Sequence, residues 1–528
     1  MMHMFQAKEK VAVIDIGSNS IRLVINEVDE KRGYRELHNL KTVARLSNHI
    51  DDQDALTAEG RDILLHTLQQ FEEVLRFHDV QTIHAVATAA VRGASNREEI
   101  LQYIEERIDF PIRVLSGEEE ASYGYLAVVN STSLSEGITI DIGGGSTEVT
   151  MFKNRELVRT HSFPFGALTL KQKFLPNDDK ITSSNLKQMN KWIEKQFQKV
   201  PWLKKEGENL PVVGIGGSSR NMVLVHQASI NYPLAGLHQY SMSGRDIAET
   251  MDLLEKSSLS ERENIEGLSK DRADVIIPAV RIISQLYNHI DAPSYLISNK
   301  GLRDGLLFEE LLRDKTYPHF PDVIEESFYQ LNREFEINPD YVDEVGNIAS
   351  SMYNSLEPYI PKSYLHEDNH RLLNRAAQVL YIGEYISSEA SSQHTFYILT
   401  NRSIDGIMHE ERIAMSLVSS FKSKSMFKEF AKPFRPYLQK NSLKRLEFLG
   451  SILKFSYSLN RTRRNIVSGL GIDKEGKELH FHIYCREGMH SAFEEAKADK
   501  YKKHLEKMIS RDVVLHFHEQ SPVSAFSS

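Results

Sequence analysis

The sequence VAVIDIGSNSIRLVI at residues 11–25 and the sequence ITIDIGGGSTEVTMF at residues 138–152 share one pattern. Each has an apolar run, then Asp-Ile-Gly, a polar turn and an alternating run. This pattern predicts a β-hairpin with glycine where the backbone bends tightly. Asp15 and Asp141 are therefore equivalent positions. Helical and strand patterns follow each hairpin, so we expect two α/β halves of the same plan.

The two turns have the composition of anion-binding loops. Backbone N–H groups beside glycine can cradle a phosphate, and a hydroxyl follows each Asp, as Ser18 and as Ser146. One glycine-rich turn can be only a tight hairpin, but two matched copies favour a ligand site. Such a pair is typical of the actin, sugar-kinase and heat-shock ATPase architecture (actin-like, ribonuclease H-like, ASKHA), in which the ligand lies between the halves. No GxxxxGK[ST] sequence occurs, which disfavours a P-loop enzyme.

The remaining pattern suggests four domains in the 528 residues. Residues 1–130 and 131–313 are the two actin-like domains. Helical periodicity punctuated by prolines predicts a helical domain over residues 314–440. A helix and returning alternation predict a small α+β domain over residues 441–528.

Composition limits the class of protein. The net charge of −9 should repel a polyanion unless a local basic surface exists. One cysteine, Cys485, excludes an internal disulfide and a cysteine-based zinc site. The sequence has no signal-peptide stretch and no apolar run of about 18 residues, so we expect a cytoplasmic protein with no membrane partner.

Seven sequence blocks in order identify a family resemblance. They lie at residues 11–25, 85–96, 114–128, 140–148, 163–170, 213–221 and 297–307. Together they resemble the exopolyphosphatase and guanosine pentaphosphate phosphatase (Ppx/GppA) family. The resemblance covers roughly the first 310 residues and implies a phosphoric anhydride hydrolase.

The resemblance implies a general base in the sequence SGEEEA. Glu120 matches the family's catalytic carboxylate, which orients and deprotonates water. The choice between Glu119 and Glu120 depends on the alignment. Read from the residues alone, these acids could simply open a helix, where they complement the helix dipole.

The other implied site residues bind metal and phosphate. Asp141 and Glu148 match acids around a divalent cation, which implies Mg²⁺, although Glu148 could be an ordinary strand residue. Arg22 and Arg92 match arginines facing phosphates, although Arg22 could be an exposed strand position. The predicted phosphate-binding set is Asp15, Gly17, Ser18, Asn19, Arg22, Arg92, Gly143, Gly144, Gly145, Ser146, Gly216, Gly217 and Ser218.

The C-terminal half raises two further expectations. Long family members carry HD phosphohydrolase-like domains here, but Leu380 and Tyr381 occupy the positions of the metal-binding pair, which favours a degenerate domain that serves binding or dimerisation. Residues 421–464 contain twelve bases and two acids, a local charge of +10, with interleaved aromatics. This tract could be a nucleic-acid surface or only a solvated face. Beside the family resemblance, a polyphosphate track is the sharper interpretation, and nucleic acid is not expected as a partner.

These observations favour a Mg²⁺-dependent exopolyphosphatase, acting as a homodimer and releasing orthophosphate from polyphosphate ends. The alternative is a guanosine pentaphosphate (pppGpp) 5′-phosphohydrolase, which would use the same acids. An alternative of another class is a non-enzymatic sensor of a nucleotide alarmone or polyphosphate. A kinase or ATPase of the wider architecture is disfavoured by the form of the SGEEEA block.

Overall fold

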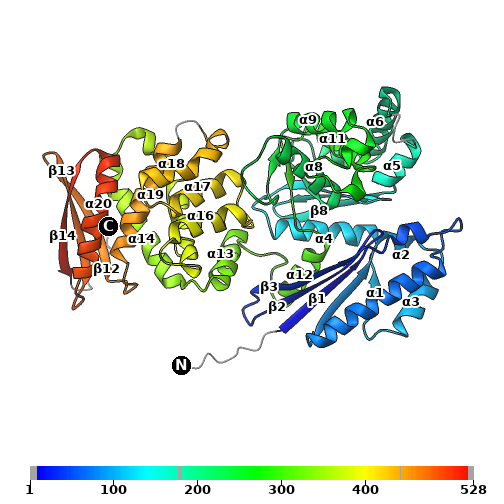
Figure 1. Ribbon diagram of the computed structural model, residues 1–528, viewed down its shortest axis with the longest axis horizontal. Coiled ribbons are helices and arrows are strands. Elements are labelled where there is room, and N and C mark those ends of the chain that lie inside the picture. Colours follow the sequence, from blue (N-terminus) through cyan, green and yellow to red (C-terminus); the bar gives the residue numbers. More distant parts are fainter. Residues whose placement is uncertain (1–8, 177–180, 440–441, 521–528) are drawn as a thin grey trace. The chain divides into compact units, whose positions relative to one another are not determined.

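The computed structural model describes residues 9–176, 181–439 and 442–520 (Figure 1). The chain forms two compact units. Unit 1 comprises Met1–Tyr232 and Leu237–Glu326, and unit 2 comprises Pro233–Gly236 and Ser327–Ser528. The finer division into four domains stays a prediction. Among the described residues, no helix is both long and apolar enough to span a membrane.

Unit 1 contains two mixed sheets of the same plan. The first has strand order β3-β2-β1-β4-β5, and the second has order β10-β11-β9-β6-β7-β8. In each, an antiparallel three-strand meander continues into parallel strands, which confirms the expected actin-like duplication. The strands of the first sheet are β1 (Glu9–Ile16), β2 (Ile21–Val28), β3 (Tyr34–Thr42), β4 (Thr82–Ala87) and β5 (Ile112–Val114). Those of the second are β6 (Gly137–Ile142), β7 (Thr147–Lys153), β8 (Glu156–Phe163), β9 (Val212–Ile215), β10 (Ser241–Met242) and β11 (Tyr295–Ile297).

Helices surround these sheets and begin where the sequence supplies caps. Thr57 accepts a hydrogen bond from the Gly60 amide, so the helix that follows starts at Ala58. The helices of unit 1 are α1 (Ala58–Phe77), α2 (Ala89–Gly93), α3 (Arg97–Glu105), α4 (Gly117–Val129), α5 (Ala167–Phe174), α6 (Ser183–Phe197), α7 (Trp202–Lys205), α8 (Gly216–Ser229), α9 (Gly244–Lys256), α10 (Leu259–Arg262), α11 (Ile276–His289) and α12 (Leu302–Leu312).

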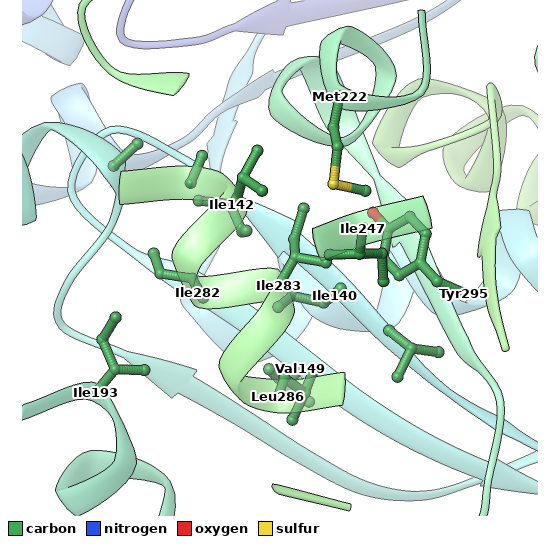
Figure 2. Packing of buried hydrophobic residues seen from close by; sticks show 14 of the residues in the cluster. Ile140, Ile142, Val149, Ile193, Met222, Ile247, Ile282, Ile283, Leu286 and Tyr295 are labelled. Atoms are coloured by element: carbon green, nitrogen blue, oxygen red, sulfur yellow. The ribbon is translucent and has the colours of Figure 1, made fainter. Parts of the chain in front are cut away.

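The core of the second half shows how alternation fixes the hairpin. Ile138, Ile140 and Ile142 occupy every second position of β6, and all are buried. They pack with Ile283 and Leu286 of α11 (Figure 2). Each fully buried side chain of this size contributes roughly 2 kcal/mol of hydrophobic free energy. A one-residue register shift would move this set to the opposite face, so the core holds the β6 end in place.

Unit 2 is mainly helical. It contains most of α13 (Val323–Glu334), then α14 (Pro339–Leu356), α15 (Asn369–Gln378), α16 (Ser391–Asn401), α17 (His409–Ser419), α18 (Lys424–Ala431), α19 (Ser442–Leu459) and α20 (Ala492–Ile509). A three-stranded sheet of order β12-β13-β14 packs on α20 through its buried face. Its strands are β12 (Val467–Glu475), β13 (Glu478–Arg486) and β14 (Asp512–Gln520). The helical region was expected, whereas β12 and α20 were not.

Candidate active site

The two predicted turns have the same backbone geometry. In the first, the Gly17 amide donates to the Ser20 carbonyl at 3.2 Å, and in the second the Gly143 amide donates to the Ser146 carbonyl at 3.0 Å. Each turn directly follows the strand that carries the aspartate. The structure therefore confirms that Asp15 and Asp141 are equivalent positions at the ends of β1 and β6.

Asp15 lies among cations. Its register partner on β2 is Arg22, and Arg303 of α12 approaches it with Nε 3.8 Å from Oδ2. Burial raises the pKa of Asp15, and the charges of Arg303 and Arg22 oppose that rise. The side chain of Arg22 also donates to Asn39 Oδ1 at 3.4 Å. Two guanidinium groups thus meet at the end of the first hairpin, as a phosphate site requires.

Asp141 lies beside another carboxylate instead. Its register partner on β7 is Glu148, which is 4% exposed. Burial and the neighbouring charges of Glu120 and Asp141 raise the pKa of Glu148 to about 8, although Ser146 and Ser162 donate hydrogen bonds to it. A bound cation would favour the charged form of Glu148 and lower its pKa.

The structure separates the two candidate bases of the SGEEEA sequence. Glu119 completes a capping box with Ser116, since each side chain bonds the other residue's backbone N–H, and these bonds lower the pKa of Glu119. Glu120, one position further along α4, is instead directed to Arg92, whose Nη1 donates to its Oε2 at 2.9 Å. Glu119 therefore serves the helix end, and Glu120 faces the other site residues.

Glu120 has the electrostatics of a general base at neutral pH. Burial raises its pKa to about 7, the Arg92 bond and charge oppose the rise, and the charges of Asp141 and Asp15 add to it. Arg92 is fixed by a second bond from Nη1 to the Leu115 carbonyl at 2.9 Å. A base is most effective when its pKa lies near the working pH.

Gly216, Gly217 and Ser218 of the predicted phosphate-binding set were expected to form a third glycine-rich turn after a strand, but they begin a helix. β9 ends at Ile215, and Gly216 is already the first residue of α8, with φ of +80°. A Cβ at this position would lie 2.2 Å from Asp141 Oδ1, so glycine is required there. A Cβ at Gly217 would meet the Arg272 guanidinium at 2.4 Å. The block thus lets a helix N-terminus approach Asp141 closely.

Oxygen ligands for a cation are present at the site. Within the described ranges, no group of three or more His, Cys, Asp or Glu side chains is arranged to hold a metal. Asp141 and Glu148 are hard oxygen donors with raised pKa values. Two carboxylates with water and phosphate oxygens suffice for Mg²⁺, which seldom has an all-protein cage.

Comparison with known proteins identifies the family of this chain. The model of the Ppx/GppA phosphatase family matches residues 23–314, and the model of domain III of that family matches residues 323–498. The chain belongs to the Ppx/GppA phosphatase family.

Solved structures of the family agree with the fold of the first half. The crystal structure of the Aquifex aeolicus family member is 26% identical, with a TM-score of 0.54, and the match covers 59% of this chain and all of that one. An exopolyphosphatase from Cytophaga hutchinsonii is 23% identical, with a TM-score of 0.52 and coverage of 59% and 100%. Both matches leave about two fifths of this chain uncovered.

Three arginines complete the site and were not assigned from sequence. Arg303 acts on Asp15, and Arg220 and Arg272 act on Asp141, whose raised pKa they moderate. Arg220 donates from Nε to the Gly216 carbonyl at 3.1 Å, and Arg272 approaches the Ser218 hydroxyl at 3.4 Å. Arg220 and Arg303 lie within two of the blocks that carry the family resemblance, and that position was the available signal.

The predicted set is brought together with some differences in role. Ser18 and Asn19 use their carbonyls to bind the amides of Ser47 and Arg45. Gly144 accepts from the amides of Leu168 and Thr169. The first turn thus bonds to the segment after β3, and the second to the start of α5. Gly17, Gly143, Gly145 and Ser146 lie in the same two turns.

Proposed function

We propose that this protein is an exopolyphosphatase, which removes the terminal phosphoryl group of polyphosphate by hydrolysis. The observation that carries the proposal is Glu120, a carboxylate with a pKa of about 7 that Arg92 holds at 2.9 Å. Family membership supports phosphatase chemistry. The choice of polyphosphate is our inference.

In the proposed reaction, the twin turns and the arginines bind the terminal phosphoryl group. Backbone amides, Arg22 and Arg92 neutralise its charge. Glu120 accepts a proton from water as the water oxygen bonds to phosphorus. The bridging P–O bond breaks, so orthophosphate and a chain one phosphate shorter leave. Positioning and charge neutralisation account for most of the rate acceleration in such transfers.

Asp141 and Glu148 are the proposed Mg²⁺ ligands. When bound, Mg²⁺ neutralises charge on phosphate oxygens. The two acids lie opposite each other on one sheet face, so both could bind one cation, whose charge would lower the raised pKa of Glu148. Removal of divalent cations with a chelator should abolish phosphate release, and added Mg²⁺ should restore it.

A cationic cluster in unit 2 supports a polymeric substrate. Lys422, Arg461 and Lys500 surround Lys454 closely enough that burial and their charges lower its pKa to about 8. A polyanion relieves such crowding. Lys422 and Arg461 of the +10 tract are exposed, although Arg461 also pairs with Glu384, and polyphosphate is the polyanion that suits a phosphatase.

The helical region of unit 2 is proposed to be a degenerate HD-like domain. Its expected metal pair is replaced by Leu380 and Tyr381, and the burial of Tyr381 fits a structural position. Homodimerisation and a cytoplasmic location stay predictions.

Phosphate release from three substrates tests the proposal. Long-chain polyphosphate should give a kcat/KM well above that for guanosine pentaphosphate or ATP. A much larger value for the guanosine nucleotide would reassign the substrate while leaving the site intact. Binding of polyphosphate and guanosine pentaphosphate with no phosphate release from either would instead favour a sensor.

A further inference from the structure

Four histidines gather on one face of the C-terminal sheet, far in sequence from the active-site residues. β13 and β14 are parallel neighbours, and His482 is the register partner of His516. Alternation buries Leu479, Phe481 and Ile483 on the face that packs on α20. The opposite face therefore presents the imidazoles, at the end of unit 2 that contains β13 and β14 (Figure 1).

The imidazoles form two pairs of the same construction. His480 Nδ1 lies 2.9 Å from His516 Nε2, and His482 Nδ1 lies 2.9 Å from His518 Nε2. The rings also stack along the sheet, with centroids of His480 and His516 at 5.2 Å and of His482 and His516 at 5.0 Å. Each pair thus joins the Nδ1 of a β13 residue to the Nε2 of a β14 residue.

A carboxylate supports the β13 member of the second pair. Asp473 Oδ2 is hydrogen-bonded to His482 Nε2 at 3.0 Å, whereas Glu475 Oε2, 3.4 Å from His480 Nε2, makes no hydrogen bond with it. A carboxylate in this position accepts the Nε2–H, so Nδ1 keeps its lone pair and faces the partner imidazole. A carboxylate bonded to the far nitrogen is the usual support of a metal-binding histidine.

We propose that these two pairs bind divalent transition-metal ions, each through two cis nitrogen ligands. Bonds of 2.0–2.1 Å at 90° place two nitrogens about 2.9 Å apart, whereas a tetrahedral angle requires about 3.3 Å. The observed 2.9 Å is also the length of the N–H···N hydrogen bond within each pair, so the two rings must turn for their lone pairs to converge on one ion; imidazole ligands with water suit Cu²⁺ or Ni²⁺.

The proposed sites differ from a closed metal centre. The described part of the chain holds no preformed group of three or more ligands, so water must complete the coordination. In the metal-free form of the second pair, His518 donates its Nε2–H to Nδ1 of His482. Metal binding requires that this proton leave Nε2 and that the neutral ring carry its N–H on Nδ1 instead.

Exposure permits ligand access at the second pair. The side chain of His482 is 28% exposed, and His518 is exposed. Gly471 is the β12 register partner of His482, and a Cβ there would meet no atom within 4 Å. The His482–His518 pair should therefore bind first, with the more buried His480–His516 pair second.

Isothermal titration of the full chain with Ni²⁺ tests the inference. All proteins carry His3→Ala, so that the histidine near the amino terminus contributes no binding. The parent should bind two Ni²⁺ ions. His518→Ala should lose the tighter binding event, which we assign to the His482–His518 pair, and His516→Ala/His518→Ala should lose both. Asp473→Asn should weaken the first site about 10- to 100-fold. Unchanged Ni²⁺ binding by the double variant would overturn the proposal.

Two controls keep the result interpretable. His366→Ala/His394→Ala removes two histidines from the helical region and should leave the titration unchanged. Should the variants of His516 and His518 fail to fold, binding of Cu²⁺ to the parent gives a second measurement. Its electron paramagnetic resonance spectrum should show coupling to two nitrogens, and coupling to none would contradict the inference.

Discussion

Asp141 and Glu148 lie directly opposite each other in the β6–β7 ladder. The equivalent pair in the first half joins Asp15 to Arg22. The duplication has therefore kept the aspartate and changed its partner from cation to anion. In the proposed function, the first hairpin binds phosphate and the second binds a cation, so the two halves would carry complementary parts of one reaction.

Replacement of Glu148 tests this division. Glu148→Gln removes one of two like charges, so we expect phosphate release to need a much higher Mg²⁺ concentration and kcat to fall by about 100-fold or more. Arg22→Gln should instead raise KM for the substrate with the Mg²⁺ requirement unchanged. Both are measured by varying Mg²⁺ and substrate independently. Equal Mg²⁺ requirements for the Glu148→Gln variant and the parent would contradict the assignment.

Glu120→Gln and Glu119→Gln form a matched pair. The first removes the proposed base and should lower kcat by about 10²–10⁴-fold. The second removes only a helix cap and should keep nearly all activity. Phosphate release under saturating substrate compares them. Our mechanism fails if the Glu120 variant keeps parental kcat.

The same two substitutions should change the free energy of unfolding in opposite directions at alkaline pH. The pKa of Glu120 is raised from 4.5 to about 7, so the folded state retains a proton that the unfolded chain releases. This group therefore favours folding at low pH, and its contribution declines as pH rises from 4.5 to 7. Glu120→Gln should stabilise the protein by about 1–3 kcal/mol at pH 8 and little near pH 5.

Glu119 supplies the control for that measurement. Hydrogen bonds from Ser116 lower its pKa, so its contribution is present above the unfolded pKa and lost in acid. Glu119→Gln should therefore lower the melting temperature at pH 8. Thermal unfolding of both variants across pH 5–8 should give shifts of opposite sign at the alkaline end.

Gly216→Ala should disturb Asp141 without unfolding the protein. The new Cβ would lie 2.2 Å from Asp141 Oδ1 at a φ of +80°, so the carboxylate must move. A displacement near 1 Å can cost about 100-fold in rate. Gly346→Ala is the control, since a Cβ there meets its nearest neighbour at 3.5 Å in a helix. Parental activity in the Gly216 variant would show that Asp141 need not be fixed.

Lys454 predicts proton uptake on polyanion binding. Its pKa is lowered to about 8, so at pH 8 a polyphosphate chain that neutralises the cluster should raise the pKa and draw a proton from buffer. Titration calorimetry in buffers of different ionisation enthalpy measures that uptake. Lys454→Met should abolish it, whereas Lys199→Met, which removes an exposed lysine of unit 1, should not.

Much of unit 1 could be predicted because its signals are local. The Asp-Ile-Gly repeats fixed both hairpins, and Thr57 marked the start of α1. The arginines of the site could not be placed, because Arg272 and Arg303 approach the aspartates only through tertiary folding. The separation of Glu119 from Glu120 had a local signal instead, since the Ser116-x-x-Glu119 spacing is that of a capping box.

In unit 2 the local signals are weaker. β12 contains two glycines and ends in charged residues, which obscures its alternation. α20 is so rich in charge that few of its residues are buried, among them Ala498, Leu505 and Ile509. The +10 count also overstated the free charge, since Arg463 pairs with Glu384 and Arg464 with Glu494. Those acids lie outside the counted stretch.

The loop Pro233–Gly236 has a consequence for the history of this chain. It belongs to unit 2, where Ala235 exchanges backbone and side-chain bonds with Thr400 and Arg412, yet unit 1 encloses it in sequence. Relatives matched over their whole length cover only 57–59% of the chain. A C-terminal half gained or lost by recombination would thus leave these four residues behind. We expect the loop to change in step with that half among homologues.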